Sequence, residues 1–221
     1  MKDLSITQEF LLCALDGKGR FSAFDYEKPV CLIAGGLLEL LNNEFVEIEN
    51  KKVVVIKELE EPLKYLYPLF NFIKNSKPKT LKSIASEYVM SFTSRKLNEL
   101  ILSVGNSLVL DDCADEVYRK SFFGRQKKYI VPKKEKIDHV IQKIRAELLE
   151  DGDISEETVG LVSLLNKCHL LKRYFSKYES DQLNIRLKEI KNSSPNKMIK
   201  EMLDYIDAMM AAIIVSTTSS R

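Results

Sequence analysis

The fold is indicated first by two apolar segments, residues 4–15, LSITQEFLLCAL, and residues 29–41, PVCLIAGGLLELL. In the first segment, Ser5 and Gln8 have the spacing of a capping box and precede an apolar run, which predicts a short helix. In the second, Pro29 suits a first helical turn, and apolar residues recur at helical spacing. This second helix is almost wholly apolar, so we expect it to be buried.

Two segments of alternating or β-branched residues interrupt the helical pattern. Residues 45–56, FVEIENKKVVVI, predict a strand, a turn and a second strand. Residues 118–131 predict another hairpin. A helix followed by a hairpin therefore occurs twice, near residues 29–56 and near residues 94–131.

The remaining segments predict further helices at about 59–74, 79–90 and 94–104. Gly105 and Asn106 are expected to end the third of these helices. A long helix is expected from Pro132 to about Leu149, then a buried one after Ser155, and a last one at about 195–215. Residues 216–221 are expected to be a loose tail. The sequence thus predicts a mainly α, single domain over residues 1–221, with its helices packed around a bundle and with one or two β-hairpins.

The composition is typical of a globular protein. The 221 residues are 45% hydrophobic and 30% charged, with a net charge of +2, so no overall field commits the chain to nucleic acid. The four cysteines are far apart, and we expect them to be reduced and mostly buried. The apolar runs are too short for a signal peptide or a membrane span. We expect a soluble, cytoplasmic protein that meets a membrane only at its surface.

The sequence contains no recognisable catalytic motif. His139 and His169 are the two histidines, and neither lies in a zinc or triad motif. No nucleophile elbow, phosphate loop or dinucleotide fingerprint occurs. Gly17, Lys18 and Gly19 form only a G-x-G turn. We therefore predict that the protein is not an enzyme, with no catalytic residues, no metal site and no cofactor.

Positive charge is concentrated in residues 119–145, which hold ten lysines and arginines against Glu135 and Asp138. Acidic residues precede and follow this basic block. One interpretation is a set of solvated faces, which charge runs usually are. The functional interpretation is a face for anions, since each Lys or Arg near an anionic leaflet contributes about 1 kcal/mol. The hairpin within the block has aromatic and basic side chains: Phe122, Phe123, Arg125, Lys127, Lys128 and Tyr129.

Residues 4–15, the turn at 17–20 and the GLLEL stretch at 36–40 resemble the N-terminal signature of the Golgi phosphoprotein 3 family. The order of later elements is also similar to that family, including Lys96 and Leu97 before Gly105. The resemblance implies a central helical bundle ringed by amphipathic helices. For eukaryotic members it implies binding of phosphatidylinositol 4-phosphate and of the cytoplasmic tails of glycosyltransferases, and a hairpin able to mediate self-association.

The resemblance also implies a lipid headgroup pocket. The family's Trp position falls on Phe24, and its Arg position in the second helix falls on Ile33. The family also has two basic residues at the start of a later helix. Lys96 matches one of them, and Arg95 lies next to the position of the other and could replace it. We expect Phe24, Arg20, Arg95 and Lys96 near the headgroup, with a weaker and less selective site, because an apolar residue cannot bind phosphate.

Three functions remain open on the sequence. The first is a non-enzymatic, peripheral membrane adaptor that binds anionic phospholipid and protein tails. The second is a nucleic-acid-binding protein, since a helix followed by a short hairpin builds a winged helix; the apolar helices before the two hairpins make this less favoured. The third, compatible with the others, is a homo-oligomer formed through the 118–131 hairpin.

Overall fold

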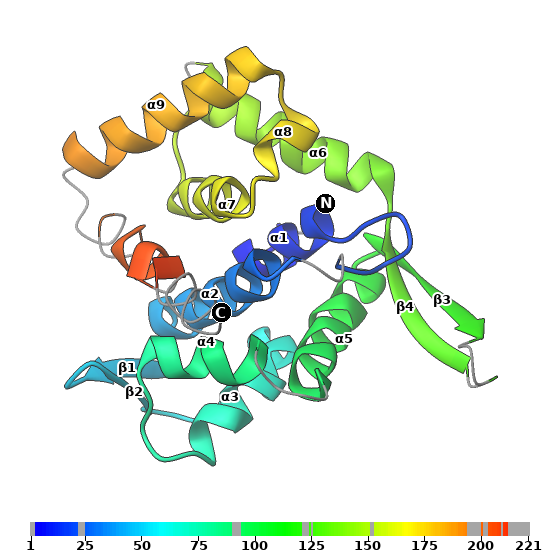
Figure 1. Cartoon of the computed structure of the whole chain (residues 1–221), viewed down its shortest axis with the longest axis vertical. Helices are drawn as coiled ribbons and strands as arrows, with labels where there is room; N and C mark the ends of the chain where they lie inside the picture. The colour runs from blue at the N-terminus through cyan, green and yellow to red at the C-terminus, as the bar shows by residue number, and fades with distance from the viewer. Residues whose placement is uncertain are drawn as a thin grey trace, which may run out of the picture.

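The computed structural model describes residues 3–21, 25–89, 94–120, 124, 126–150, 153–193, 200, 203–208 and 210–211. It is a mainly α fold with two separate hairpins, as predicted. Its centre is formed by three helices, α1 (Ile6–Ala14), α2 (Glu27–Asn42) and α7 (Glu156–Lys167). They lie in the middle of the molecule, with the other helices above and below (Figure 1).

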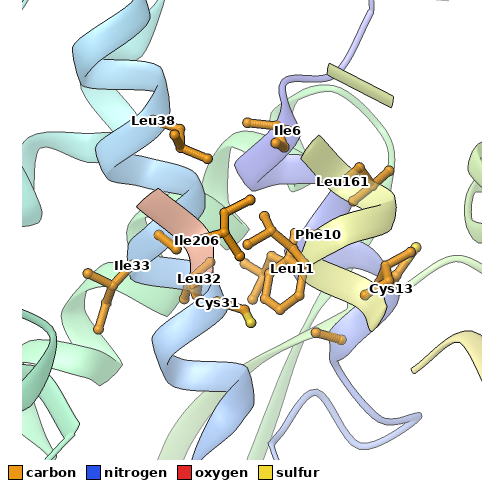
Figure 2. Close-up of a cluster of buried hydrophobic side chains, with 14 of the residues drawn as sticks. Ile6, Phe10, Leu11, Cys13, Cys31, Leu32, Ile33, Leu38, Leu161 and Ile206 are labelled. Carbon is orange, nitrogen blue, oxygen red and sulfur yellow. The ribbon is translucent and has the colours of Figure 1, made fainter. Parts of the chain in front are cut away.

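Helix α1 is buried along its whole length. The capping box is formed as predicted, because the Ser5 hydroxyl accepts from the Gln8 N–H and the Gln8 side chain accepts from the Ser5 N–H. Phe10 and Leu11 of α1 pack in one cluster with Leu32 of α2 and Leu161 of α7 (Figure 2). Ile206, in the helical residues 203–208, joins the same cluster and is fully buried. The helical residues 203–208 therefore contribute to the core.

The surrounding helices are amphipathic. A 3-10 turn (Leu63–Leu66), α3 (Tyr67–Lys74), α4 (Leu81–Val89) and α5 (Arg95–Leu110) lie on one side of the centre. The other side holds α6 (Lys134–Ile144), a π-helical turn (Arg145–Leu149), α8 (Leu171–Tyr174) and α9 (Lys177–Ser193) (Figure 1). In α6, for example, Val140, Ile141 and Ile144 are buried, whereas the neighbouring Asp138 and His139 are exposed.

Both predicted hairpins are present. Strands β1 (Val46–Glu49) and β2 (Lys52–Val55) pair antiparallel, with Val46 opposite Val55. Strands β3 (Ala114–Lys120) and β4 (Gln126–Pro132) pair antiparallel from Ala114–Pro132 to Lys120–Gln126. This second hairpin projects from the side of the helical body (Figure 1). It begins four residues earlier than predicted.

Two predicted helices have wrong boundaries. The segment 59–74 is helical only from residue 63, because residues 57–62 form an irregular connection that contains three acidic residues and Pro62. The helix predicted at 94–104 does not end at Gly105 but continues to Leu110. A Cβ at residue 105 would lie 2.5 Å from the Ile130 side chain. This glycine therefore makes room for the hairpin and does not end the helix.

Several predictions fall outside the described residues. They include the start of the last predicted helix at 195 and the tail at 216–221. Of that helix, residues 200, 203–208 and 210–211 are described, and they are helical. The four cysteines are free and buried, as predicted.

Candidate functional site

A closed turn follows α1 and carries Arg20. The Asp16 side chain accepts through Oδ1 from the N–H groups of Lys18 at 2.8 Å and Arg20 at 2.9 Å. The Asp16 backbone also exchanges hydrogen bonds with Gly19 and Arg20. Asp and Gly suit such a turn, because Asp can bond its own backbone and Gly accepts a positive φ. Gly19 has a φ of 71°. The turn leaves Arg20 exposed at its end.

The β3–β4 hairpin is docked against this turn. Arg119 of β3 donates from Nη1 to the Lys18 carbonyl oxygen at 2.6 Å. Ile130 of β4 is buried between the backbone of Gly19 and that of Gly105 in α5. Both glycines leave too little space for a Cβ beside Ile130. The hairpin, the turn and α5 are therefore held together at one junction.

A cavity of about 310 Å³ lies at this junction. Its walls come from the turn, the start of α2, the first turns of α5 and β4. The lining residues are Leu15, Gly19, Arg20, Phe21, Asp25, Tyr26, Pro29, Val89, Ser94, Leu97, Asn98, Ile101, Leu102, Lys127, Lys128, Tyr129 and Ile130. Cavities of this size hold small ligands or parts of larger ones. We refer to it as the junction pocket.

The lining of the junction pocket includes three cations, Arg20 from the turn and Lys127 and Lys128 from β4. Lys128 is paired with Glu116 of β3, and Asp25 is paired with Lys28 at 2.6 Å. Arg20 and Lys127 have no carboxylate partner in the part of the chain that the structure describes. A guanidinium and an ammonium that line the same pocket suit an anion such as a phosphate oxygen.

The wall formed by α5 is apolar. Leu97, Ile101 and Leu102 are half-buried and line the junction pocket. The sequence reasoning missed them, although their spacing places them on one face of a helix and could have been read as a second apolar stripe.

The predicted headgroup residues are only partly brought together. Arg20 lines the junction pocket, but Arg95 is 81% exposed and pairs with Glu99 at 2.8 Å. Lys96 lies 4.2 Å from the centre of the Phe72 ring and 3.5 Å from a Glu87 oxygen. Neither of these α5 cations is a lining residue. The α5 part of the wall is formed instead by Ser94, Leu97, Asn98, Ile101 and Leu102.

Some of the other predicted site residues lie outside the described part of the chain. Phe24 lies outside the described residues, as do Phe122, Phe123 and Arg125 at the hairpin tip. Ile33, at the family's Arg position, is fully buried in the core (Figure 2). Of the remaining hairpin residues, Lys127, Lys128 and Tyr129 line the junction pocket. Tyr129 also lies 5.2 Å from the Arg119 guanidinium.

The basic block of residues 119–145 is less cationic in the structure than in the sequence. Four of its cations pair with carboxylates from other segments. The pairs are Lys128 with Glu116, Lys133 with Asp112 and Asp115, Lys143 with Glu9, and Arg145 with Glu179. Carboxylates of other segments therefore offset part of the positive charge of residues 119–145. Within this block, Lys127 lines the junction pocket and has no carboxylate partner among the described residues.

A larger cavity of about 840 Å³ lies at the opposite ends of the same helices. Its lining includes Ile6 at the start of α1, Asn42 at the end of α2 and Leu110 at the end of α5. Carboxylates outnumber lysines among its described lining residues: Asp3, Glu39, Glu61, Asp111, Glu147, Glu156 and Glu157 against Lys64 and Lys143. Such a lining repels an anion, so size alone does not identify the candidate site.

The described part of the chain has neither a metal-binding cluster nor a membrane-spanning helix. Within it, no group of His, Cys, Asp and Glu side chains could hold a metal ion. No described helix is both long enough and apolar enough to cross a bilayer.

The family model of Golgi phosphoprotein 3 (GPP34) matches residues 6–209. No curated protein has a significant match to the chain. The matched region covers nearly the whole sequence and contains the turn, α5 and the hairpin that form the junction pocket. The resemblance inferred from residues 4–15 and 36–40 is thereby confirmed: the chain belongs to the Golgi phosphoprotein 3 (GPP34) family.

Proposed function

We propose that this protein is a non-enzymatic, peripheral membrane adaptor that binds anionic phospholipid through the junction pocket. The observation that carries the proposal is the presence of Arg20 and Lys127, both without a carboxylate partner in the described residues, on the lining of one cavity. Near an anionic leaflet, each such cation contributes about 1 kcal/mol. The family membership supports a Golgi-type phosphoinositide adaptor as the general class.

The position of the junction pocket also suits a surface-bound protein. The pocket is lined by β4 of the hairpin and by residues of the helical body. The β3–β4 hairpin projects from that body (Figure 1). A hairpin that reaches a membrane would bring Lys127 and the pocket to the headgroup layer together, because Ile130 fixes β4 to the turn. Binding of protein tails and self-association through the hairpin remain part of the proposal.

Vesicle flotation tests this function. The full chain is mixed with vesicles of phosphatidylcholine alone or with 30 mol% phosphatidylglycerol, at low salt and at physiological salt. We expect the protein to float only with the anionic vesicles, and less at higher salt. Equal flotation with both vesicle types, or none with either, contradicts the proposal.

A charge-matched pair of variants locates the surface. Arg20→Glu combined with Lys127→Glu is expected to lower partitioning at least tenfold, since two attractive charges become repulsive. The control reverses the same charge at Lys172 of α8 and Lys188 of α9, which are exposed and do not line the junction pocket. If the control lowers binding as much as the test variant, net charge and not the pocket is responsible.

Nucleic-acid binding is less favoured by the fold. Most of α2, which precedes the first hairpin, is buried, and a buried helix cannot enter a groove. A mobility shift with random duplex DNA at low salt remains the test of that alternative.

A further inference from the structure

The chemistry of the junction pocket specifies which part of a lipid it can hold. We infer that the pocket binds a phospholipid with a single phosphate in preference to phosphatidylinositol 4-phosphate, which carries two. The phosphate would lie at Arg20 and Lys127, and the first part of an acyl chain would lie against α5. The inference rests on the proposed function and names its ligand class.

The first argument concerns the number of phosphates. Phosphatidylinositol 4-phosphate carries a phosphodiester and a phosphomonoester, so a selective site must supply cations at two places. Here the carboxylate-free cations of the described lining are Arg20 on the turn and Lys127 on β4. A second set of cations from α2 and α5 is missing from the described lining. The α2 position holds Ile33, which is fully buried, and Arg95 and Lys96 of α5 pair with carboxylates outside the pocket.

The second argument concerns the part of the pocket wall that α5 forms. Leu97, Ile101 and Leu102 of α5 are half-buried and line the pocket. Partly exposed aliphatic side chains gain from contact with methylene groups, whereas polyol hydroxyls placed against them lose hydrogen bonds to water. Polar lining residues are also present, among them Ser94 and Asn98, and they suit the glycerol and ester oxygens of a lipid.

The third argument concerns size. A cavity of about 310 Å³ is at the small end of ligand pockets. It can enclose a few methylene groups together with a glycerol, but not a whole lipid. The remainder of the lipid would stay in the leaflet, which is compatible with a protein that binds at the membrane surface.

Water-soluble probes test the inference on the native, full-length chain. The probes are 1-hexanoyl-lysophosphatidylglycerol below its critical micelle concentration, its deacylated counterpart glycerophosphoglycerol, and inositol 1,4-bisphosphate. Each is titrated by calorimetry and by NMR of isoleucine methyl groups. We expect the acylated probe to bind at least tenfold more tightly than glycerophosphoglycerol and more tightly than inositol 1,4-bisphosphate, and to shift the Ile101 methyl signals. Equal affinity of the acylated and deacylated probes, or tighter binding of inositol 1,4-bisphosphate, overturns the inference.

Variants assign the contact. Ile101→Ala with Leu102→Ala should weaken binding of the acylated probe about tenfold and leave glycerophosphoglycerol unchanged. The control is Val109→Ala, a half-buried apolar residue of the same helix that does not line the pocket. If the double variant fails to fold, the three probes on the native chain still decide the question.

Flotation separates this inference from the proposed function. If the native chain binds no anionic vesicle and none of the probes, both are overturned. If it binds anionic vesicles but shows no preference for the acylated probe, only the ligand class inferred here is wrong.

Discussion

Gly19 of the turn lies directly against the backbone of Ile130 in β4: a Cβ at residue 19 would lie 2.3 Å from the Ile130 carbonyl oxygen. Real Cβ atoms do not approach a carbonyl oxygen this closely, so only glycine fits. The same contact places Arg20, the next residue in the chain, beside the strand that carries Lys127. The positions of Arg20 and Lys127 in the junction pocket therefore depend on a glycine that carries no side chain to bind a ligand.

The Gly19→Ala variant is expected to lose about 2–3 kcal/mol of unfolding free energy. The positive φ of residue 19 costs a side-chain-bearing residue about 1–2 kcal/mol, and the overlap with Ile130 adds to that cost. Chemical denaturation measures the change, and vesicle flotation should show weaker binding. Gly17→Ala is the matched control, since a Cβ there meets nothing within 4 Å. Equal effects of the two substitutions would contradict this role of Gly19.

Ile33→Arg tests whether the family's cation position can serve the junction pocket in this chain. Ile33 is fully buried, so an arginine there would be a buried charge without a partner. We expect a loss of about 3–5 kcal/mol of unfolding free energy and no gain in lipid binding. Ile33→Val should cost only about 1 kcal/mol. A stable Ile33→Arg protein with tighter binding to anionic vesicles would show that the side chain reaches the pocket after all.

Local sequence patterns were sufficient to predict the central elements. The capping box at Ser5 and Gln8 and the leucine spacing of residues 29–41 predicted α1 and α2, because these signals depend on neighbours within one helix. The strand–turn–strand pattern of residues 45–56 predicted the first hairpin for the same reason. The end of α5 could not be predicted this way, since Gly105 is explained by Ile130, which lies 25 residues further along the chain.

The direction of the site's side chains depends on contacts between distant segments. Lys143 pairs with Glu9 and Arg145 with Glu179, so the charge of residues 119–145 could not be judged from that segment alone. Lys96 turns toward Glu87 and Phe72, which belong to α4 and α3. The sequence identified which residues carry charge, whereas the packing determines which of them line the junction pocket.

A buried hydrogen-bond network beside the larger cavity provides a third prediction. The Tyr65 hydroxyl lies 2.5 Å from Glu39 Oε2, and the Thr7 N–H donates to Glu39 Oε1 at 2.6 Å. Burial raises the pKa of the Glu39 carboxyl, and these hydrogen bonds oppose that rise. Tyr65→Phe removes one of them, so we expect a loss of about 1–3 kcal/mol of unfolding free energy.

The matched substitution for Tyr65→Phe is Tyr67→Phe. The Tyr67 side chain is 56% exposed, so this change should stay within about 0.5 kcal/mol. Thermal denaturation of both variants against the native chain measures the difference. If Tyr65→Phe is as stable as Tyr67→Phe, the hydroxyl contributes nothing to the fold.

Glu9 of α1 makes the stability depend on pH. Its carboxylate contacts Lys143 at 3.2 Å, yet burial raises its pKa from 4.5 to about 7, since the loss of hydration outweighs the attraction to Lys143. The folded chain therefore binds more protons at this site than the unfolded chain between about pH 4.5 and 7. Stability linked to Glu9 is full below that window and falls as the pH rises through it, by up to about 3 kcal/mol.

Glu9→Gln removes this titration, so the variant should lose less stability than the native chain between pH 5 and pH 7.5. Urea denaturation at both pH values gives the difference for each protein, which cancels the contributions of all other groups. Gln keeps the shape of the side chain and can still accept a hydrogen bond from Lys143, so the fold is expected to persist. The control, Glu150→Gln, changes an exposed carboxylate and should keep the native pH profile. If Glu9→Gln also keeps that profile, the Glu9 carboxyl is ionised in the folded chain throughout this range, and Lys143 compensates fully for its burial.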